Sequence, residues 1–401
     1  MPRLDPFQGL RYDTQRAHLS QVIAPPYDVI DPAQRSRLAA RHPANAVRVE
    51  LPVADLGLGL DRYETAAMLL DRWQEEGTVG RDERPALYAY RMTSPDGGSS
   101  TGVIGALGLG EPDEETDILP HEETLPTPRS DRLELLRATR ANLSPIWVLS
   151  LASGLSATFG DLAAPDEDVV DDDGVRHQLW VLDDPDVVAA VVDSVASAPV
   201  VVADGHHRYQ TARTYQAERR AATNGAPGPY DQVMALVVEL SEEQLDVGAI
   251  HRTIDHLPEG TELPTLFGRY FDVVRAGDRS ERVISALGES SSLALIDPES
   301  AWLLVPREEA YEAARSDLDS SLVSLVLDDL PAGSVTHRHS TAEVVESLSA
   351  GEAQGAVLLR PVTVKQIARW ADERRRMPPK TTFFRPKPRT GMVYRTLDDP
   401  N

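Results

Sequence analysis

Segments with the spacing of strands and segments with the spacing of helices alternate along almost the whole chain. Residues 85–93 and 101–110 alternate like strands on either side of a Gly-rich turn, which predicts a β-hairpin. Residues 60–77 carry apolar side chains at helical spacing and end at a glycine. This alternation predicts an α+β or mixed α/β fold. An apolar content of 41% over 401 residues is enough for more than one core.

The pattern also suggests how the chain is divided. We expect residues 1–254 to form an α+β domain and residues 255–362 a C-terminal α/β domain. Residues 363–401 are expected to form a helix and a basic tail that folds back on the body. Within the first domain, residues 31–42 predict a helix capped by Asp31. Residues 46–52, AVRVELP, alternate like a strand.

Composition excludes several classes of protein. The chain has no cysteine, so it has no disulfides, thiolate nucleophiles or cysteine zinc sites. Its net charge of −24 argues against nucleic acid as a partner. No apolar run approaches the ~20 residues of a membrane helix, and the first residues lack the apolar core of a signal peptide. We therefore expect a cytoplasmic protein that does not bind membranes.

The stretch VVADGHHRYQTAR, Val201–Arg213, reads as a strand that turns into a helix. A helix N-terminus exposes backbone N–H groups and favours anions. Gly205 permits a tight turn and a close approach of a ligand. Arg208 adds a forked donor suited to phosphate, and His207 a further donor. The stretch therefore predicts a site for phosphate or nucleotide.

Two neighbouring side chains are candidates for chemistry at this turn. His206 could move a proton near neutral pH. Asp204 could hold an imidazole in one tautomer, act in catalysis or bind a metal ion. The alternative is that Asp204 only caps the helix and that the histidines lie on the surface.

Other candidates are scattered along the chain. His121 and Glu122 stand in a proline-bounded loop and could supply a general base or metal ligands. Arg132 follows and could hold an anion; the alternative is a plain loop and helix cap. Further substrate-binding candidates, each with a structural alternative, are Tyr27, Asp28, Asn45, Arg48, His251 and Arg252.

The C-terminal segment is basic in an acidic protein. Residues 374–395 contain basic residues and no acidic ones. Lysine is rare in the chain, yet Lys380 and Lys387 both lie here. A lysine is a compact charge that suits phosphate, so we expect one of the two to reach a bound phosphate. The alternatives are a tail that pairs with the acidic body and an RNA-binding arm.

A series of motifs along the chain resembles a known family. The motifs are APPYDVI (24–30), HEET (121–124), DRL (131–133), NLSPIWVL (142–149), DGHHRY (204–209), HR (251–252) and MPPKTTFFRPK (377–387). In this order they resemble the DUF1015 family. The Asp-Gly-His-x-Arg element is also similar to that of the free-serine kinases, which have a ParB-like fold. That resemblance implies a ParB/sulfiredoxin-like core with an additional α/β C-terminal region.

The leading hypothesis is a nucleotide-dependent phosphotransferase that acts on a small molecule, with an amino acid such as serine as one candidate. ATP or ADP and Mg²⁺ are the expected cofactors, because phosphoryl transfer depends on positioning and charge stabilisation. His206 or Glu122 would take the proton of the acceptor. One alternative is a ParB-like protein that senses a nucleotide without chemistry. Another is a metal-dependent hydrolase with Asp204 among its ligands.

Overall fold

The computed structural model describes residues 1–111, 117–120, 130–160, 162–289 and 292–398. Contacts within the chain group the residues into two compact units. Unit 1 contains Met1–Asp246 and Pro386–Asn401, and unit 2 contains Val247–Arg385. The chain thus leaves unit 1 once and returns to it for its last residues. The division into residues 1–254, 255–362 and 363–401 stays a prediction.

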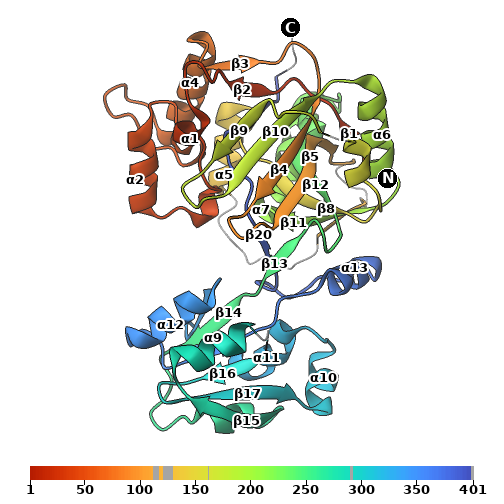
Figure 1. The fold of residues 1–401 in the computed structure, drawn as a ribbon. Coiled ribbons are helices and arrows are strands. Elements are labelled where there is room, and N and C mark those ends of the chain that lie inside the picture. Colours follow the sequence, from red (N-terminus) through yellow and green to blue (C-terminus); the bar gives the residue numbers. More distant parts are fainter. Residues whose placement is uncertain (112–116, 121–129, 161, 290–291, 399–401) are drawn as a thin grey trace. The chain divides into compact units, whose positions relative to one another are not determined.

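A mixed nine-stranded sheet forms the centre of unit 1 (Figure 1). Its order is β6-β11-β8-β12-β5-β4-β10-β9, with β1 paired to β5. The strands are β1 (Leu4–Asp5), β4 (Leu87–Thr93), β5 (Ser99–Gly108), β6 (Ile118–Pro120), β8 (Ile146–Ser150), β9 (Glu167–Val170), β10 (Arg176–Leu182), β11 (Val200–Asp204) and β12 (Gln232–Glu239). Strand β12 runs parallel to β8 and antiparallel to β5. The predicted hairpin is confirmed, because β4 pairs antiparallel with β5.

Helices cover this sheet, and their apolar faces complete its core. The helices of unit 1 are α1 (Leu19–Val22), α2 (Pro32–Arg41), α3 (Val47–Glu50), α4 (Arg62–Glu75), α5 (Ser130–Thr139), α6 (Pro185–Ala196) and α7 (His206–Ala222). Figure 1 shows α2 and α4 on one side of the sheet and α6 on the other. Val191 and Val195 of α6 join the buried strand residues Val200 and Val202 in one apolar cluster. Burial of such side chains provides most of the free energy of folding.

The returning C-terminal residues are part of unit 1. Strand β21 (Arg395–Thr396) pairs antiparallel with β7 (Ala141–Asn142). A further short pair joins β2 (Leu10–Tyr12) to β3 (Val79–Arg81). Arg389 is buried and donates through Nε to Asp171 Oδ2 at 2.6 Å. Residues 386–398 are therefore held in unit 1 by a strand pairing and by ion pairs.

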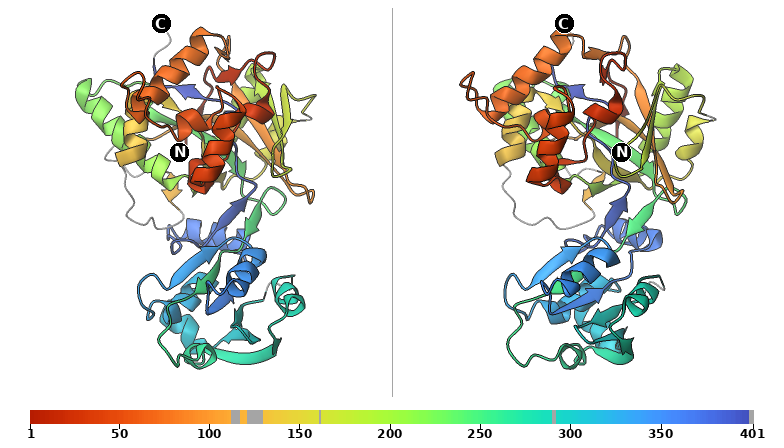
Figure 2. Two further views of the ribbon diagram at one scale, coloured as in Figure 1. Left: turned by 90° about the vertical axis from the view of Figure 1, so that its left-hand side faces the viewer. Right: turned by 60° about the vertical axis from the view of Figure 1, so that its left-hand side comes forward.

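Unit 2 contains a six-stranded antiparallel sheet of order β15-β17-β16-β19-β14-β18 (Figure 2). The strands are β14 (His251–Ile254), β15 (Phe271–Asp278), β16 (Ala294–Ile296), β17 (Ser300–Pro306), β18 (Val335–Arg338) and β19 (Gly355–Leu358). The helices are α8 (Leu263–Phe267), α9 (Glu281–Glu289), α10 (Glu308–Ala314), α11 (Asp319–Leu327), α12 (Thr341–Ser349) and α13 (Val364–Asp372). Alternate side chains of β16 enter two apolar clusters, since Leu295 joins one, and Ala294 and Ile296 the other. A separate two-stranded pair joins β13 (Asp246–Gly248) to β20 (Phe383–Arg385).

The mixed α/β class predicted from the alternation is confirmed. One local prediction was wrong, because residues 46–52 do not form a strand. Val47–Glu50 form one turn of helix, α3. The side chain of Asn45 starts this turn, since its Oδ1 accepts a hydrogen bond from Val47 N at 3.0 Å. Such local side-chain bonds compete with strand pairing.

Candidate functional site

The junction of β11 and α7 has the geometry that its sequence predicts. Strand β11 ends at Asp204, and α7 begins at His206. Gly205 caps the helix with φ +87°, a left-handed conformation that favours glycine. A Cβ at this position would lie 3.1 Å from Arg208 Nε and from Ile146 Cγ2. Glycine therefore allows both the turn and the close approach of the Arg208 guanidinium.

Asp204 holds two cations at this turn. Arg208 Nη2 donates to Asp204 Oδ2 at 2.9 Å, and Lys387 Nζ forms an ion pair with Oδ1. Burial alone would raise the pKa of Asp204, but Lys387 and Arg208 outweigh it and lower this pKa. Asp204 is therefore ionised at neutral pH and acts as the counter-ion of both cations. Its predicted roles in catalysis and metal binding stay predictions.

Arg208 makes two further contacts, both with the residues just before β8. Its Nη1 donates to Pro145 O at 2.5 Å and to Ser144 Oγ at 3.0 Å. Its Nε is buried and has no hydrogen-bond partner among the described residues. Burial lowers the pKa of Arg208, but the combined effect of its neighbours, with Asp204 first and then Asp28, raises this pKa overall. The side chain is thus a fixed, permanently charged donor whose Nε–H has no acceptor among the described residues.

Glu50 is a functional candidate that the sequence analysis missed. It ends α3, is 2% exposed, and its Oε1 lies 3.4 Å from Ser144 Oγ and 3.4 Å from Arg132 Nη1. Its Oε2 is buried without a hydrogen-bond partner among the described residues. Leaving such an oxygen unpaired is costly in free energy. Burial raises the pKa of Glu50, although Arg132 and Arg208 partly oppose the shift.

Arg132 belongs to the same cluster, as its sequence position suggested. Its Nε and Nη2 donate to Asp131 Oδ2 at 2.9 and 2.7 Å, and its Nη1 donates to Glu50 O at 2.8 Å. Its guanidinium lies over the ring of Tyr27, 4.4 Å from the centroid. Burial raises the pKa of the Tyr27 hydroxyl, and the charge of Arg208 lowers it in part. Asp28 is exposed, and its charge contributes to raising the pKa of both Arg208 and Glu50.

These side chains line one small cavity. Glu50, Arg132, Ser144 and Arg208 surround about 60 Å³ together with apolar side chains of α5 and α7. Ser144 links the two charged groups, because it accepts from Arg208 and donates to Glu50. The cluster therefore combines a proton acceptor of raised pKa with fixed guanidinium donors, which suits acid–base chemistry on an anionic substrate.

Several residues that the sequence predicted for the site do not line the small cavity around Glu50. Asn45 is fully buried, and its Nδ2 donates to Gln21 O at 2.7 Å, so its polar atoms are engaged locally. Arg48 Nη2 donates to Ala39 O at 2.7 Å. His206 and His207 lie in the first turn of α7 and are half-buried. Their predicted roles stay predictions. His121 and Glu122 lie outside the described residues.

Three of the predicted residues belong to unit 2. Arg252 is 5% exposed, and its guanidinium donates to Ile250 O at 2.7 Å and to Lys380 O at 2.9 Å. Leu359 N donates to His251 Nδ1 at 3.1 Å. Burial, followed by the charge of Arg252, lowers the pKa of His251 to about 4. These residues form a cluster of their own, and their predicted roles at the phosphate site stay predictions.

The described residues bear on two further expectations, a metal site and a membrane-spanning helix. They contain no group of three or more His, Asp or Glu side chains that could hold a metal ion. Every helix in the described part of the chain is too short or too polar to cross a lipid bilayer.

Some solved structures are similar to this chain. SbnI with a C-terminal truncation, from Staphylococcus aureus, is 12% identical with a TM-score of 0.40, and the match covers 72% of this chain and 86% of SbnI. A free serine kinase in complex with AMP is 12% identical with a TM-score of 0.36, covering 71% and 86% of the two chains. A conserved hypothetical protein from Pyrococcus furiosus is 12% identical with a TM-score of 0.36, covering 73% and 93%. Scores this low do not assign a function. No curated protein matches the chain.

The family described as protein of unknown function (DUF1015) matches residues 4–332. This range contains Glu50, Arg132, Ser144, Asp204 and Arg208. The family match agrees with the resemblance that the sequence motifs indicated. The chain therefore belongs to the DUF1015 family.

Proposed function

We propose that this protein is a nucleotide-dependent phosphotransferase that acts on a hydroxyl group of a small molecule, such as the amino acid serine. The observation that carries the proposal is the buried carboxylate of Glu50, whose Oε2 lacks a hydrogen-bond partner among the described residues. A substrate hydroxyl bound at Oε2 would donate the hydrogen bond that this oxygen lacks. Its raised pKa brings Glu50 nearer to the range of an efficient general base.

The phosphates of ATP or ADP would bind at the first turn of α7. This helix has 17 residues, and the partial positive charge at its N-terminus favours an anion. Arg208 offers a buried Nε–H that has no partner among the described residues. Lys387 contributes a second cation, which Asp204 holds in place. Because these groups are fixed before binding, they can stabilise transition-state charge without reorganising.

The proposed step transfers the terminal phosphoryl group. Glu50 Oε2 accepts the proton of the substrate hydroxyl, and the hydroxyl oxygen of the substrate forms a bond to the terminal phosphorus of the nucleotide. The bond between that phosphorus and the bridging oxygen of the nucleotide breaks, and the nucleotide leaves with one phosphate fewer. The proton on Glu50 is then released to solvent. Arg132 and Ser144 position Glu50 through the 3.4 Å contacts to its Oε1.

Mg²⁺ is expected with the nucleotide. The described residues offer no cluster of three side chains for it, and both oxygens of Asp204 accept from cations. A metal ion held by protein side chains therefore has no part in the proposed step. Mg²⁺ commonly binds through substrate phosphates and only one or two carboxylates. The ParB-like core implied by the DGHHRY motif likewise remains part of this proposal.

The test is phosphorus NMR of purified protein with ATP or ADP, Mg²⁺ and a pool of amino acids. The proposal predicts a new phosphomonoester signal that disappears in Glu50→Gln. The matched control is Glu75→Gln, which changes an exposed glutamate at the end of α4 and should turn over like the wild type. Saturable nucleotide binding without any product would instead favour a sensing protein. The absence of both nucleotide binding and product across the whole panel would contradict the proposal.

A further inference from the structure

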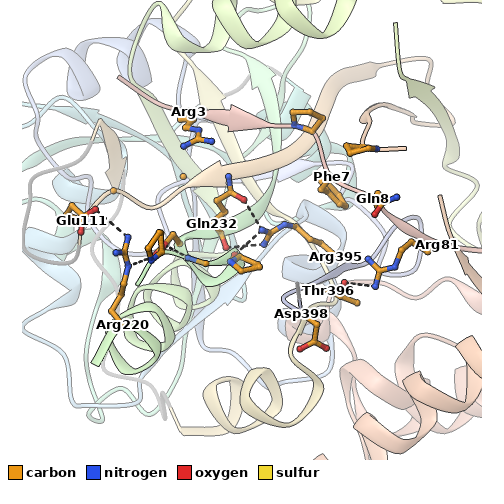
Figure 3. Close-up of a pocket in the computed structure, with 18 of the residues that line it drawn as sticks. Arg3, Phe7, Gln8, Arg81, Glu111, Arg220, Gln232, Arg395, Thr396 and Asp398 are labelled. Atoms are coloured by element: carbon orange, nitrogen blue, oxygen red, sulfur yellow. Dashed lines mark hydrogen bonds and ion pairs between the residues drawn. The ribbon is translucent and has the colours of Figure 1, made fainter. Parts of the chain in front are cut away.

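A second, larger pocket lies in unit 1 outside the cluster around Glu50. Its volume is about 870 Å³, and its lining includes Phe7, Arg81, Arg220, Gln232, Arg395 and Thr396. We call it the arginine pocket. Figure 3 shows the guanidinium of Arg395 near the centre of the lining and that of Arg81 beside Thr396. A pocket of this size falls within the range of ligand sites, about 300–1,000 Å³.

Arg395 is buried without a carboxylate partner. It is 4% exposed, and its Nη2 donates to Pro229 O and to Gln232 Oε1, each at 2.9 Å. Its Nη1 lies 3.2 Å from Asn142 Oδ1 and from Gln232 O. All of these acceptors are neutral. Burial lowers the pKa of Arg395 to about 10, with only a partial opposing effect from Asp5.

Arg81 adds a second guanidinium with no carboxylate partner among the described residues. It ends β3 and is exposed, and its Nη2 donates to Thr396 Oγ1 at 3.0 Å. Thr396 follows Arg395 in β21, so Arg81 contacts the residue next to Arg395.

The other two arginines of the pocket differ in this respect. Arg220 Nε donates to Asp231 Oδ1 at 2.8 Å, and Arg3 Nε lies 2.8 Å from Asp5 Oδ2. Both charges are therefore neutralised within the protein. Among the arginines that line the pocket, Arg81 and Arg395 are thus the two without an ion pair in the described part of the chain.

Apolar groups form part of the same wall. The pocket is lined by Phe7 and by the prolines at positions 6, 85, 227 and 229. The ring of Phe7 is fixed against Tyr88, with a centroid distance of 5.2 Å. A pocket that combines rigid apolar surface with a few fixed charged donors selects ligands that have both properties.

We propose that the arginine pocket binds a small organic anion, with a carboxylate or phosphate group at Arg81 and Arg395 and an apolar body against Phe7 and the prolines. The exposed guanidinium of Arg81 can bind either oxyanion with two hydrogen bonds. The Nη groups of Arg395 already donate to neutral oxygens, so Arg395 contributes its positive charge. The anion supplies the ion-pair partner that neither arginine has among the described residues. This site is separate from the one proposed for nucleotide and does not depend on it.

Isothermal titration calorimetry with phenyl phosphate, benzoate and uncharged benzyl alcohol tests the proposal. We expect saturable binding of at least one of the two anions and no comparable binding of the alcohol. Arg81→Gln should weaken anion binding about tenfold, the effect of losing one charge-assisted contact. Arg37→Gln, an exposed arginine of α2, is the matched control and should bind like the wild type.

A further variant separates this site from the nucleotide site, because phenyl phosphate could also bind there. Lys387→Gln should leave the affinity of the arginine pocket for phenyl phosphate or benzoate unchanged. Equal binding of the alcohol would show an apolar pocket only, and an unchanged affinity in Arg81→Gln would show binding elsewhere. Either result, or no saturable binding of both anions, overturns the proposal. Because Arg81 is exposed, this variant is expected to fold even if Arg395→Gln does not.

Discussion

Arg132 contacts Glu50 at two points, since its Nη1 donates to the backbone oxygen at 2.8 Å and lies 3.4 Å from Oε1. The second carboxylate oxygen has no partner in the described part of the chain. Arg132 thus fixes where the end of α3 and the Glu50 side chain lie, while one oxygen stays available. Positioned and incompletely satisfied groups of this kind are characteristic of functional sites.

Glu50→Gln should stabilise the protein at neutral pH. Because the folded-state pKa of Glu50 is raised, the folded state holds its proton at pH values where the unfolded state has lost it. Stability therefore falls as pH rises from the ordinary value of 4.5 through the raised pKa, and it stays lower above that range. A neutral amide removes this loss, and we expect a gain of about 1 kcal/mol. Urea unfolding at pH 8 and at pH 4 measures it: the gain should be present at pH 8 and absent at pH 4.

Turnover should depend on the same ionisation. A general base acts only when it is deprotonated, so the rate should fall as pH decreases through the raised pKa of Glu50. The acid limb of the pH–rate profile is therefore expected above 4.5, the ordinary value for a glutamate. The measurement is kcat against pH with saturating nucleotide. An acid limb at the ordinary value would assign the proton transfer to a different, more exposed carboxyl group.

Gly205→Ala should weaken nucleotide binding as well as stability. The residue has φ +87°, and its new Cβ would press on Arg208 Nε and Ile146 Cγ2 at 3.1 Å. We expect a loss of about 1–2 kcal/mol in the free energy of unfolding and a displaced Arg208. Gly154→Ala is a matched control, because it has φ +86° with no atom within 4 Å of the added Cβ. It should lose stability but keep its nucleotide affinity, and equal affinity in both variants would contradict the role given to Arg208.

Asp171→Asn should loosen the C-terminal segment. Asp171 accepts from Arg389 Nε at 2.6 Å and binds His177 Nε2 at 2.8 Å. Burial would raise the pKa of Asp171, but His177 and Arg389 outweigh it and lower the pKa to about 2. Its contribution is therefore complete above 3.8 and is lost as pH falls toward about 2.

The expected loss at neutral pH is about 3 kcal/mol, since the substitution leaves the buried Arg389 charge with a weaker partner. Asp172→Asn removes a more exposed partner of Arg41 and should cost less than about 1 kcal/mol. Denaturant unfolding of the two variants provides the comparison. Hydrogen exchange of residues 386–398 should increase in Asp171→Asn alone; equal protection in both variants would show that the strand pairing holds the segment without this ion pair.

The sequence was sufficient to predict features that are set by neighbouring residues. The β11–α7 turn follows from Asp204 and Gly205, and the β4–β5 hairpin follows from its Gly-rich turn. Asp31 caps α2 as predicted, since its Oδ1 accepts from Gln34 N at 2.7 Å. Each of these depends on local hydrogen bonds or backbone conformation, which a short pattern can report.

Glu50 could not be predicted, because its role depends on contacts that are remote in the sequence. In AVRVELP it falls on the polar side of an apparent strand, where a glutamate normally faces water. The Asn45 side chain turns this stretch into helix α3, and Arg132 and Ser144 approach from 82 and 94 residues away. The one local signal was the asparagine before an apolar pair, which is typical of a helix start.

The basic residues of the C-terminal segment make contacts of different kinds. Lys387 reaches Asp204 across 183 residues, and its expected contact with a bound phosphate stays a prediction. Arg389 pairs with Asp171, which agrees with the alternative that the tail neutralises the acidic body. Arg395 makes neither kind of contact, because its partners are neutral oxygens. Charge composition alone could not separate these three roles, since they depend on the residue that each arginine or lysine meets.

The most direct test of the account compares nucleotide binding and phosphoryl transfer in the wild type and in Glu50→Gln. The account predicts that the nucleotide dissociation constant changes by less than about threefold, while kcat falls by about 10²–10⁴-fold, the usual contribution of a general base. Phosphorylated product formed by Glu50→Gln at the wild-type rate would contradict it.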